Sequence, residues 1–592
     1  MKVSAGMIRI HKGEDRMNVQ RMAFSSGLAV ALAVLVSGCG STSAAARSAL
    51  KPVPGGTIVE ALSPQAQVTW YNPLQNPAND TLLNSQVAYM MYMPLIYIND
   101  KYQIDYQYSI AKRVTYNKAG TVYHVYMNPK YTWSDGAPVT STDVLWTWKI
   151  IQATSSTKAQ APWPYANADF GDIPNGVKSI VANGKYEFTV TLSQPANQEW
   201  FIYNGLTQLL PLPKQAWNKY PANITREITY LGQEATNPHF DTVVDGPYKL
   251  KSAVPSQAWT FVPNKQYTGG AKAYDTLILE FEGSDASEFA ALKTGTVQLG
   301  YVDLSEYGAR GGLKGIDTLH PGYNFGYNFM AVNMNSDAKG GLGPVFRQLY
   351  VRQAIAESID QAAIDQSVYH GFAPPQYSNI PSNPPTAFLD PKLKKPLYPF
   401  NLTRAQALLT SHGWTEVHGV MTKNGQSLSF PLMYASGSTS ITDAVSLVQS
   451  DLGKIGIKVT LEPEPSSSLL GILTNGSNQW DAVAGFGITY SGYYPAGDAV
   501  FHSGGGLDFF GWNNATEDRL IAGFQDQPST SLTANLKAYY KFEEYTAKEL
   551  PVIFMNRPST IIAVAKNLKG VNPLTLNTIV GYGLPQLWWV SK

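Results

Sequence analysis

A single cysteine, Cys39, stands in this chain of 592 residues, and this constrains the fold more than any other feature. No disulfide can form within the chain, so a body of this length has to be stabilised by packing alone. Hydrophobic residues make up 44% of the chain and aromatic residues 12%, which is typical of a globular protein. Because domains usually contain about 100–200 residues, the length predicts more than one core.

Cys39 follows a segment with the pattern of an export signal. Arg21 precedes an apolar run that ends in Ser37 and Gly38. The run has about a dozen residues, too few to span a bilayer. It resembles a bacterial lipoprotein signal, in which a diacylglyceryl group is attached to the cysteine thiol. We therefore expect a signal peptide over residues 1–38, lipidation of Cys39 and a tether over 39–54, the alternative being a buried free cysteine after an ordinary signal peptide.

The charge pattern argues against highly charged partners. The whole chain has a net charge of +1, and residues 1–38 hold five basic and two acidic residues, so the remainder carries −2. Nucleic acid and anionic lipid are poor partners for such a chain. The 35 Tyr and 13 Trp, with many Asn and Gln, instead favour a cleft for an uncharged or mixed polar ligand, because rings supply contact area at low entropic cost.

Predicted helices and strands alternate along the chain without an internal repeat, which indicates α/β lobes. Alternating or turn-bounded apolar residues predict strands at 55–62, 123–127, 186–192, 248–250 and 457–461. Helical periodicity predicts helices that begin after Thr140 and at Thr403, and helices over 351–359, 445–455 and 533–549. Thr140 and Asp143 have the spacing of a capping box.

Four segments carry a resemblance to a known family. They are Tyr131–Val144, Asp245–Leu250, Val351–Asp360 and Ala405–Trp414. In this order they resemble the extracellular solute-binding proteins (family 5) of peptide and nickel ABC importers, from about Gly55 to Lys592. Asp-Gly turns and capping residues in these segments are expected to shape loops and helix ends, and not to contact a ligand.

The resemblance implies an α/β, two-lobed periplasmic-binding-protein type II fold, with a hinge and an extra subdomain in lobe one. Lobe one would comprise residues 55–322 and 553–592, and lobe two residues 323–552. The implied function is a lipid-anchored, extracytoplasmic component of an ABC importer. It would capture an oligopeptide or a similar extended solute by lobe closure and deliver it to the membrane permease. We expect a monomer that is not an enzyme and needs no cofactor.

The resemblance also implies where a ligand lies. In peptide-binding relatives the peptide is held like an added strand, and its ammonium pairs with an aspartate shortly after a Gly-Trp pair. Here Phe486 replaces the tryptophan and Thr489 the aspartate. Unless Asp498 substitutes, the pocket should not favour a free N-terminus, and Asp498 has the alternative of capping a loop. The residues expected at the ligand are Trp70, Tyr71, Asn72, Tyr323, Asn324, Tyr327, Phe486, Gly487, Thr489 and Tyr490.

Three other functions compete with peptide binding. An aromatic, charge-poor cleft also suits an oligosaccharide. Metal-chelate binding is less favoured, because the eight histidines show no i, i+4 pairing and His412 and His418 flank an expected turn. A serine acylase has support only from Ser155–Lys158 and Lys293–Gly295, without the Ser-Asp-Asn element between them.

Overall fold

The computed structural model describes residues 55–156, 164–270 and 274–591. The signal segment, Cys39, the tether and Lys158 lie outside these residues, so the structure says nothing about them. Within the described residues, no helix has both the length and the apolar character needed to cross a membrane.

A seven-stranded sheet forms the core of lobe one. Its strand order is β10-β19-β9-β1-β8-β7-β6. β1 runs parallel to β8 and β9, and the remaining neighbours are antiparallel. The bounds are β1 (Thr57–Ala61), β6 (Tyr248–Val254), β7 (Ala258–Pro263), β8 (Thr276–Glu280), β9 (Leu299–Val302), β10 (Asp317–Gly322) and β19 (Thr560–Ala565).

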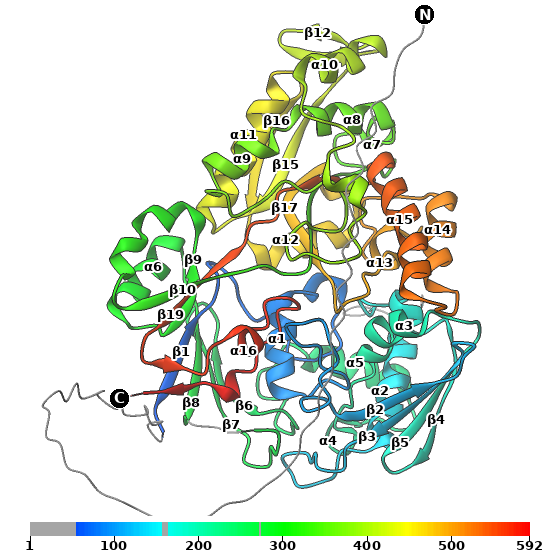
Figure 1. Ribbon diagram of the computed structural model, residues 1–592, viewed down its shortest axis with the longest axis vertical. Helices are drawn as coiled ribbons and strands as arrows, with labels where there is room; N and C mark the ends of the chain where they lie inside the picture. The colour runs from blue at the N-terminus through cyan, green and yellow to red at the C-terminus, as the bar shows by residue number, and fades with distance from the viewer. Residues whose placement is uncertain (1–54, 157–163, 271–273, 592) are drawn as a thin grey trace, which may run out of the picture. The chain divides into compact units, whose positions relative to one another are not determined.

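A five-stranded sheet forms the core of lobe two and lies in the upper half of Figure 1. Its order is β16-β15-β17-β11-β18, with β15 parallel to both β16 and β17 and the other pairs antiparallel. The bounds are β11 (Gly326–Val332), β15 (Ser429–Ala435), β16 (Lys458–Glu464), β17 (Ala482–Thr489) and β18 (Ile553–Met555).

The chain passes between the two sheets twice. The first passage lies between β10 and β11, where the expected boundary between residues 322 and 323 falls. The second lies between β18 and β19. The sequence placed the return to lobe one at residue 553, but β18 still pairs with β11 of lobe two. By this strand pairing, lobe two extends to Met555.

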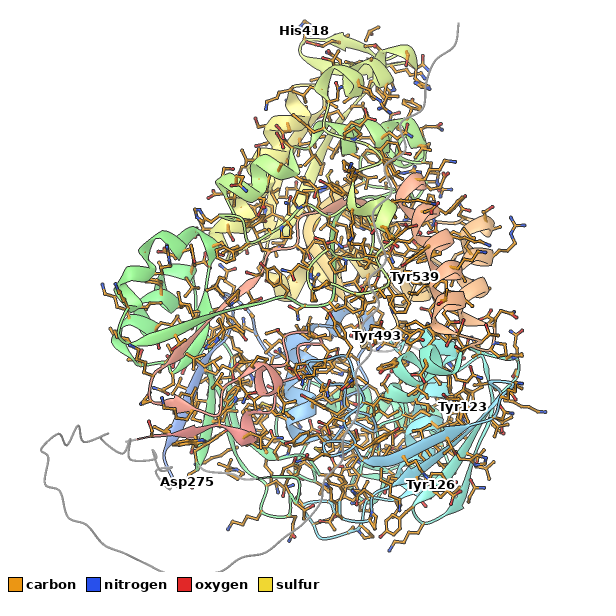
Figure 2. The ribbon with its side chains drawn as sticks, in the orientation of Figure 1. Tyr123, Tyr126, Asp275, His418, Tyr493 and Tyr539 are labelled. Atoms are coloured by element: carbon orange, nitrogen blue, oxygen red, sulfur yellow. The ribbon has the colours of Figure 1, made fainter. Side chains whose placement is uncertain are left out.

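An antiparallel four-stranded sheet, β2-β3-β5-β4, occupies the lower right of Figure 1. Its side chains alternate as predicted: Phe188, Val190 and Leu192 of β5 are buried. On β3, Tyr123 is buried and Tyr126 is partly exposed under the guanidinium of Arg113 (Figure 2). The bounds are β2 (Ala111–Tyr116), β3 (Val122–Met127), β4 (Val177–Gly184) and β5 (Glu187–Leu192).

The predicted helix after Thr140 is α2 (Ser141–Thr154). Its capping box is present, since the Thr140 N–H donates to Asp143 Oδ2 at 2.8 Å. The helix predicted from Thr403 begins earlier, because Asn401 and not Thr403 is its N-cap and accepts from the Arg404 N–H. The longer helices are α1 (Leu82–Met91), α5 (Ile224–Glu234), α6 (Asp285–Thr294), α8 (Leu349–Ser358), α10 (Leu402–Ser411), α11 (Thr439–Gly453), α12 (Ser466–Asn475), α14 (Ala515–Gln525) and α15 (Leu532–Glu549).

Shorter α-helices and strands lie between these elements. The helices are α3 (Gln198–Asn204), α4 (Lys214–Trp217), α7 (Gly343–Phe346), α9 (Gln361–Ser367), α13 (Asp498–Phe501) and α16 (Pro573–Leu576). The strands are β12 (Thr415–Val417), β13 (Val420–Lys423), β14 (Gln426–Ser427), β20 (Leu568–Lys569) and β21 (Trp589–Val590).

Two buried charged side chains of the family-like segments form hydrogen bonds with backbone groups, in line with the structural role expected of these segments. Arg352 is buried and donates to the carbonyls of Phe346, Glu549 and Leu550. Its charge therefore neutralises the carbonyl-rich C-terminus of α15. Asp245 is also buried and accepts from the Met93 N–H at 2.9 Å. These side chains are engaged by backbone groups, which explains why they identify a fold and not a ligand.

Candidate functional site

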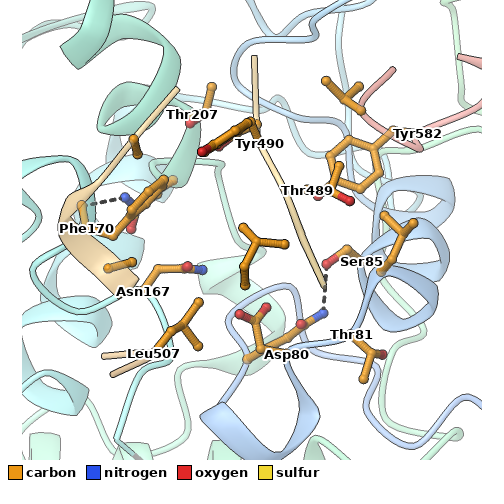
Figure 3. Close-up of a pocket in the computed structure, with 18 of the residues that line it drawn as sticks. Asp80, Thr81, Ser85, Asn167, Phe170, Thr207, Thr489, Tyr490, Leu507 and Tyr582 are labelled. Atoms are coloured by element: carbon orange, nitrogen blue, oxygen red, sulfur yellow. Dashed lines mark hydrogen bonds between the residues drawn. The ribbon is translucent and has the colours of Figure 1, made fainter. Parts of the chain in front are cut away.

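A cavity of about 430 Å³ lies between the two lobes. Lobe one contributes α1 and the loops around it, and lobe two contributes β17 and the segment that follows it (Figure 3). Most of the lining is aromatic, aliphatic or uncharged polar. Its aromatic residues are Tyr89, Tyr97, Tyr165, Phe170, Tyr327, Phe486, Tyr490 and Tyr582.

The wall formed by β17 has a free edge. β11 pairs with β17 over Ala482–Thr489, whereas β15 pairs only with Ala482–Ala484. At the end of the β15 pairing stands Gly485, with φ of +67°, opposite a register shift in β11. A bulge with a left-handed glycine bends its strand. β17 therefore leaves β15 at this point, and Gly485–Thr489 line the cavity with a strand neighbour on one side only.

Backbone groups of this edge point toward the cavity. The Tyr490 N–H donates to the Phe325 carbonyl at 2.8 Å, so these two residues form a hydrogen-bonded pair. Hydrogen-bonded and non-hydrogen-bonded pairs alternate along antiparallel strands. The N–H and C=O groups of Gly487 and Thr489 are consequently directed away from β11. They are available to an extended chain lying alongside β17.

Five of the expected residues line this cavity: Tyr327, Phe486, Gly487, Thr489 and Tyr490. Tyr490 is buried, and its hydroxyl accepts from Asn379 Nδ2 and donates to the Asn379 carbonyl, both at 3.0 Å. Tyr327 packs against Tyr490 and Phe501. The positions of both tyrosines are thus fixed by lobe-two contacts.

The other five expected residues lie elsewhere. Trp70, Tyr71 and Asn72 are buried in lobe one and do not line the cavity. The Trp259 indole donates to the Tyr71 hydroxyl, and Asn72 Oδ1 accepts from the Leu74 N–H, so both side chains stabilise the loop. Tyr323 and Asn324 lie at the crossing between the lobes. Asn324 lines a second cavity of about 250 Å³, and Tyr323 lines neither cavity.

Asp498 does not reach the cavity. It is buried at the first turn of α13, and its Oδ2 accepts from the Gly171 N–H of lobe one at 2.8 Å. Burial raises its pKa to about 6. The side chain therefore joins the lobes and does not replace the carboxylate absent at Thr489.

A cation lies beside Thr489. Arg557 follows β18 and donates to Thr489 Oγ1 at 3.0 Å, Asn328 Oδ1 at 2.9 Å and the Ile488 carbonyl at 3.2 Å. All three acceptors are neutral, and no Asp or Glu of the described chain forms an ion pair with it. Burial lowers the pKa of Arg557 to about 10, so it stays charged at neutral pH. The surroundings of Thr489 are thus electropositive.

The sequence analysis missed Asp80, an acidic residue of the cavity whose charge is opposite to that of Arg557. Asp80 is the charged residue among the described residues that line the cavity. Figure 3 shows its carboxylate directed into the cavity. Burial raises its pKa to about 6. Asp80 lies in a loop between a short 3-10 turn and α1, where no periodicity or motif marks it.

The residues behind the metal and acylase alternatives do not line this cavity where the structure describes them. No group of three His, Cys, Asp or Glu side chains suited to a metal occurs in the described part of the chain. His418 lies at the tip of the β12–β13 hairpin, as Figure 2 shows, and His412 stacks on Tyr350. The Lys293–Gly295 segment is the C-terminus of α6, with Gly295 at φ of +76°. Lys158 falls outside the described residues.

Comparison with known proteins gives consistent matches. The model of the bacterial extracellular solute-binding proteins, family 5, matches residues 105–505. The oligopeptide-binding protein AppA of Bacillus subtilis is 23% identical, over 95% of this chain and 97% of its own length. Its structure in complex with a nonapeptide has a TM-score of 0.77, with 22% identity, 92% of this chain and all of that chain covered. NikZ of Campylobacter jejuni in complex with Ni(L-His) has a TM-score of 0.71, with 19% identity, covering 91% of this chain and 100% of NikZ. The fold is therefore the mixed α/β fold of the periplasmic binding proteins.

Proposed function

We propose that this chain, which belongs to family 5 of the bacterial extracellular solute-binding proteins, captures an extended oligopeptide between its two lobes. The observation that carries the proposal is the free edge of β17. A peptide that adds as a strand satisfies the exposed N–H and C=O groups of Gly487 and Thr489. Such recognition depends on the ligand's backbone and so accepts many side chains.

Capture proceeds by closure of the lobes. Hydrogen bonds between lobes flank the cavity, including Gly171 to Asp498 and Asn204 Nδ2 to the Tyr494 carbonyl at 3.1 Å. A ligand that touches both walls favours this closed arrangement, because it binds the open one through a single wall. Enclosure then buries the peptide against the aromatic lining. The protein changes its conformation and leaves the ligand chemically unaltered.

The closed, loaded protein delivers its ligand to an ABC permease while a lipid on Cys39 holds it at the membrane. Support comes from the lipoprotein-like segment before Cys39 and from family membership. The small residues after Cys39 supply a tether to the first strand. Transport, and not catalysis, is the resulting role.

An oligosaccharide is the second candidate ligand. The tyrosine and phenylalanine rings of the lining offer stacking surfaces for sugar faces. A sugar does not pair with a strand edge in register, however, so the geometry of Gly485–Thr489 favours the peptide.

A thermal-shift screen separates these ligands. Pools of random peptides and of cello- and manno-oligosaccharides are added to the purified protein, and peptides are expected to raise the melting temperature. Thr489→Pro removes the N–H that faces the cavity, and Thr489→Val is its matched control because it keeps the N–H and loses only the hydroxyl. We expect Thr489→Pro to bind peptide about tenfold more weakly than Thr489→Val. Stabilisation by sugars alone, or equal peptide affinity of the two variants, contradicts the proposal.

A further inference from the structure

Asp80 brings an unpaired negative charge to the cavity. No Lys, Arg or His of the described chain forms an ion pair with it. One polar neighbour is the Gln75 amide, which donates to Ser85 Oγ at 3.2 Å. Turned by half a rotation, the same amide donates to Asp80 Oδ1 at 3.0 Å. Either way this neighbour is neutral, and a carboxylate that is partly withdrawn from water without a counter-charge is costly in its charged form.

Three tyrosines have hydroxyl groups that experience the charge of this carboxylate. Tyr89 and Tyr582 contact each other with ring centroids 4.3 Å apart, and both line the cavity. The charge of Asp80 raises the pKa values of Tyr89, Tyr165 and Tyr582 beyond the effect of burial, which marks these hydroxyls as its titratable neighbours. All three stay neutral near pH 7. Aromatic rings attract organic cations through their faces, and a carboxylate in the same cavity adds a full negative charge.

We propose that Asp80, with the rings of Tyr89 and Tyr582, binds the cationic group of the ligand. The inference rests on the proposed peptide function and names the charge that the cavity selects. The ligand is an extended chain whose ammonium or guanidinium lies against lobe one. The Arg557 side of β17 excludes the same group from Thr489. The two walls thus orient a ligand by charge, one attracting and one repelling a cation.

The cation comes either from the α-ammonium of a peptide or from a Lys or Arg side chain. Two matched pairs of probes distinguish these sources. The first is penta-alanine and N-acetyl-penta-alanine. The second is an N-acetylated pentapeptide with one central Lys and the same peptide with norleucine in its place. Calorimetry gives the affinity ratio within each pair.

We expect the wild-type protein to prefer the cationic member of at least one pair by about tenfold. Asp80→Asn should abolish that preference and leave the affinity for the neutral member unchanged, whereas a purely structural role changes both. Asp80→Glu should retain part of the preference. The matched control is Asp443→Asn, which removes an exposed carboxylate from α11 and should leave the ratio unaltered.

The rings and pH provide independent checks. Tyr89→Leu should reduce the preference several-fold, and Tyr89→Phe, which keeps the ring, should not. The preference should also decline as the pH falls below about 6, where Asp80 becomes protonated. Equal affinities within both pairs, or a preference that survives Asp80→Asn, contradict the role of Asp80. Either result leaves the proposed peptide function standing. Failure of all four peptides to bind overturns the peptide function and this inference with it.

Discussion

Arg557 donates a hydrogen bond from Nη2 to the Thr489 hydroxyl at 3.0 Å, so a guanidinium lies where the resemblance led us to look for a carboxylate. This pairing connects the crossing after β18 with the free edge of β17. It also offers a reason why Thr489 stands where the family resemblance implies an aspartate, because the Arg557 charge already occupies the space beside this side chain. A second cation beside Thr489 would be repelled, which leaves Asp80 on the opposite wall to accept one.

The first prediction concerns this pair. In Thr489→Asp the new carboxylate should pair with Arg557 and gain no affinity for a ligand ammonium. We expect the affinity ratio of penta-alanine to its N-acetyl form to change less than about twofold. In the double variant Thr489→Asp/Arg557→Gln the carboxylate is free, and the ratio should rise about tenfold, or ~1.4 kcal/mol. Calorimetry measures both ratios, with Thr489→Asn as the uncharged control. A tenfold rise in Thr489→Asp alone would show that Arg557 does not hold that position.

Local patterns predicted much of the fold. Alternation in Glu187–Leu192 and the Thr140–Asp143 capping box both depend on neighbours within a few residues, and both are present. The helix after Asn401 began earlier than predicted because Asn and Thr are both good caps and only the folded chain selects one. The resemblance to the family predicted the five cavity residues on β11, on β17 and directly after β17, because it depends on contiguous segments of sequence.

The rest of the site depends on long-range packing. Arg557 lies 68 positions from Thr489 in sequence, and no motif in the sequence around it predicts a position beside the ligand site. Asp80 is a loop residue whose importance arises only because the lobe-two strand lies across the cavity from it. Trp70 and Tyr71 have the composition of a ligand site, yet the fold uses them in the core. Composition cannot distinguish the two uses of an aromatic ring.

The second prediction is a stability difference caused by Asp80. In the folded protein its pKa of about 6 lies above the ordinary value of about 3.9 for an aspartate, so its ionisation opposes folding. The stabilising contribution of the protonated form is present below about pH 4 and is lost as the pH rises through about 6. Asp80→Asn should therefore unfold with the wild type near pH 4 and be more stable at about pH 7.5, by on the order of 1–3 kcal/mol. Urea unfolding of ligand-free protein at both pH values measures this.

Asp443→Asn serves as the control for that experiment as well, because its exposed carboxylate should make almost no difference at either pH. A destabilised Asp80→Asn protein at about pH 7.5 would mean that the carboxylate makes a structural contact, contrary to a binding role.

The third prediction is lipidation of Cys39. Protein prepared from membranes of the native host should carry a diacylglyceryl group on this thiol and partition into detergent, because Ser37 and Gly38 precede the chain's single cysteine. Cys39→Ser should be released or keep its signal segment. Intact-mass spectrometry decides, and a membrane-derived protein without the added mass contradicts the anchor.

The last prediction concerns closure. Asp303 of lobe one accepts from the Ser438 hydroxyl at 2.7 Å, and from the Ser440 N–H at 3.1 Å and the Ser440 hydroxyl at 2.8 Å, at the N-terminus of α11 in lobe two. An anion at a helix N-terminus is stabilised by the unpaired amides and the helix dipole. Asp303→Ala removes these bonds from the closed form. It also removes the hydrogen bond from the Ser305 N–H to Asp303 Oδ1 at 2.9 Å, which lies within lobe one and is lost from the open and closed forms alike.

A hydrogen bond to a charged group contributes about 1.5–3 kcal/mol net. If closure loses the equivalent of about one such bond, peptide affinity should fall roughly tenfold to a hundredfold. Small-angle scattering should show a smaller decrease in radius on peptide addition than in the wild type, since closure is then less complete. Asp443→Asn, on the same helix but exposed, should behave as wild type. Unchanged affinity together with an unchanged decrease in radius would mean that Asp303 does not contribute to closure, and that the contacts around Asp498 on the other flank are sufficient.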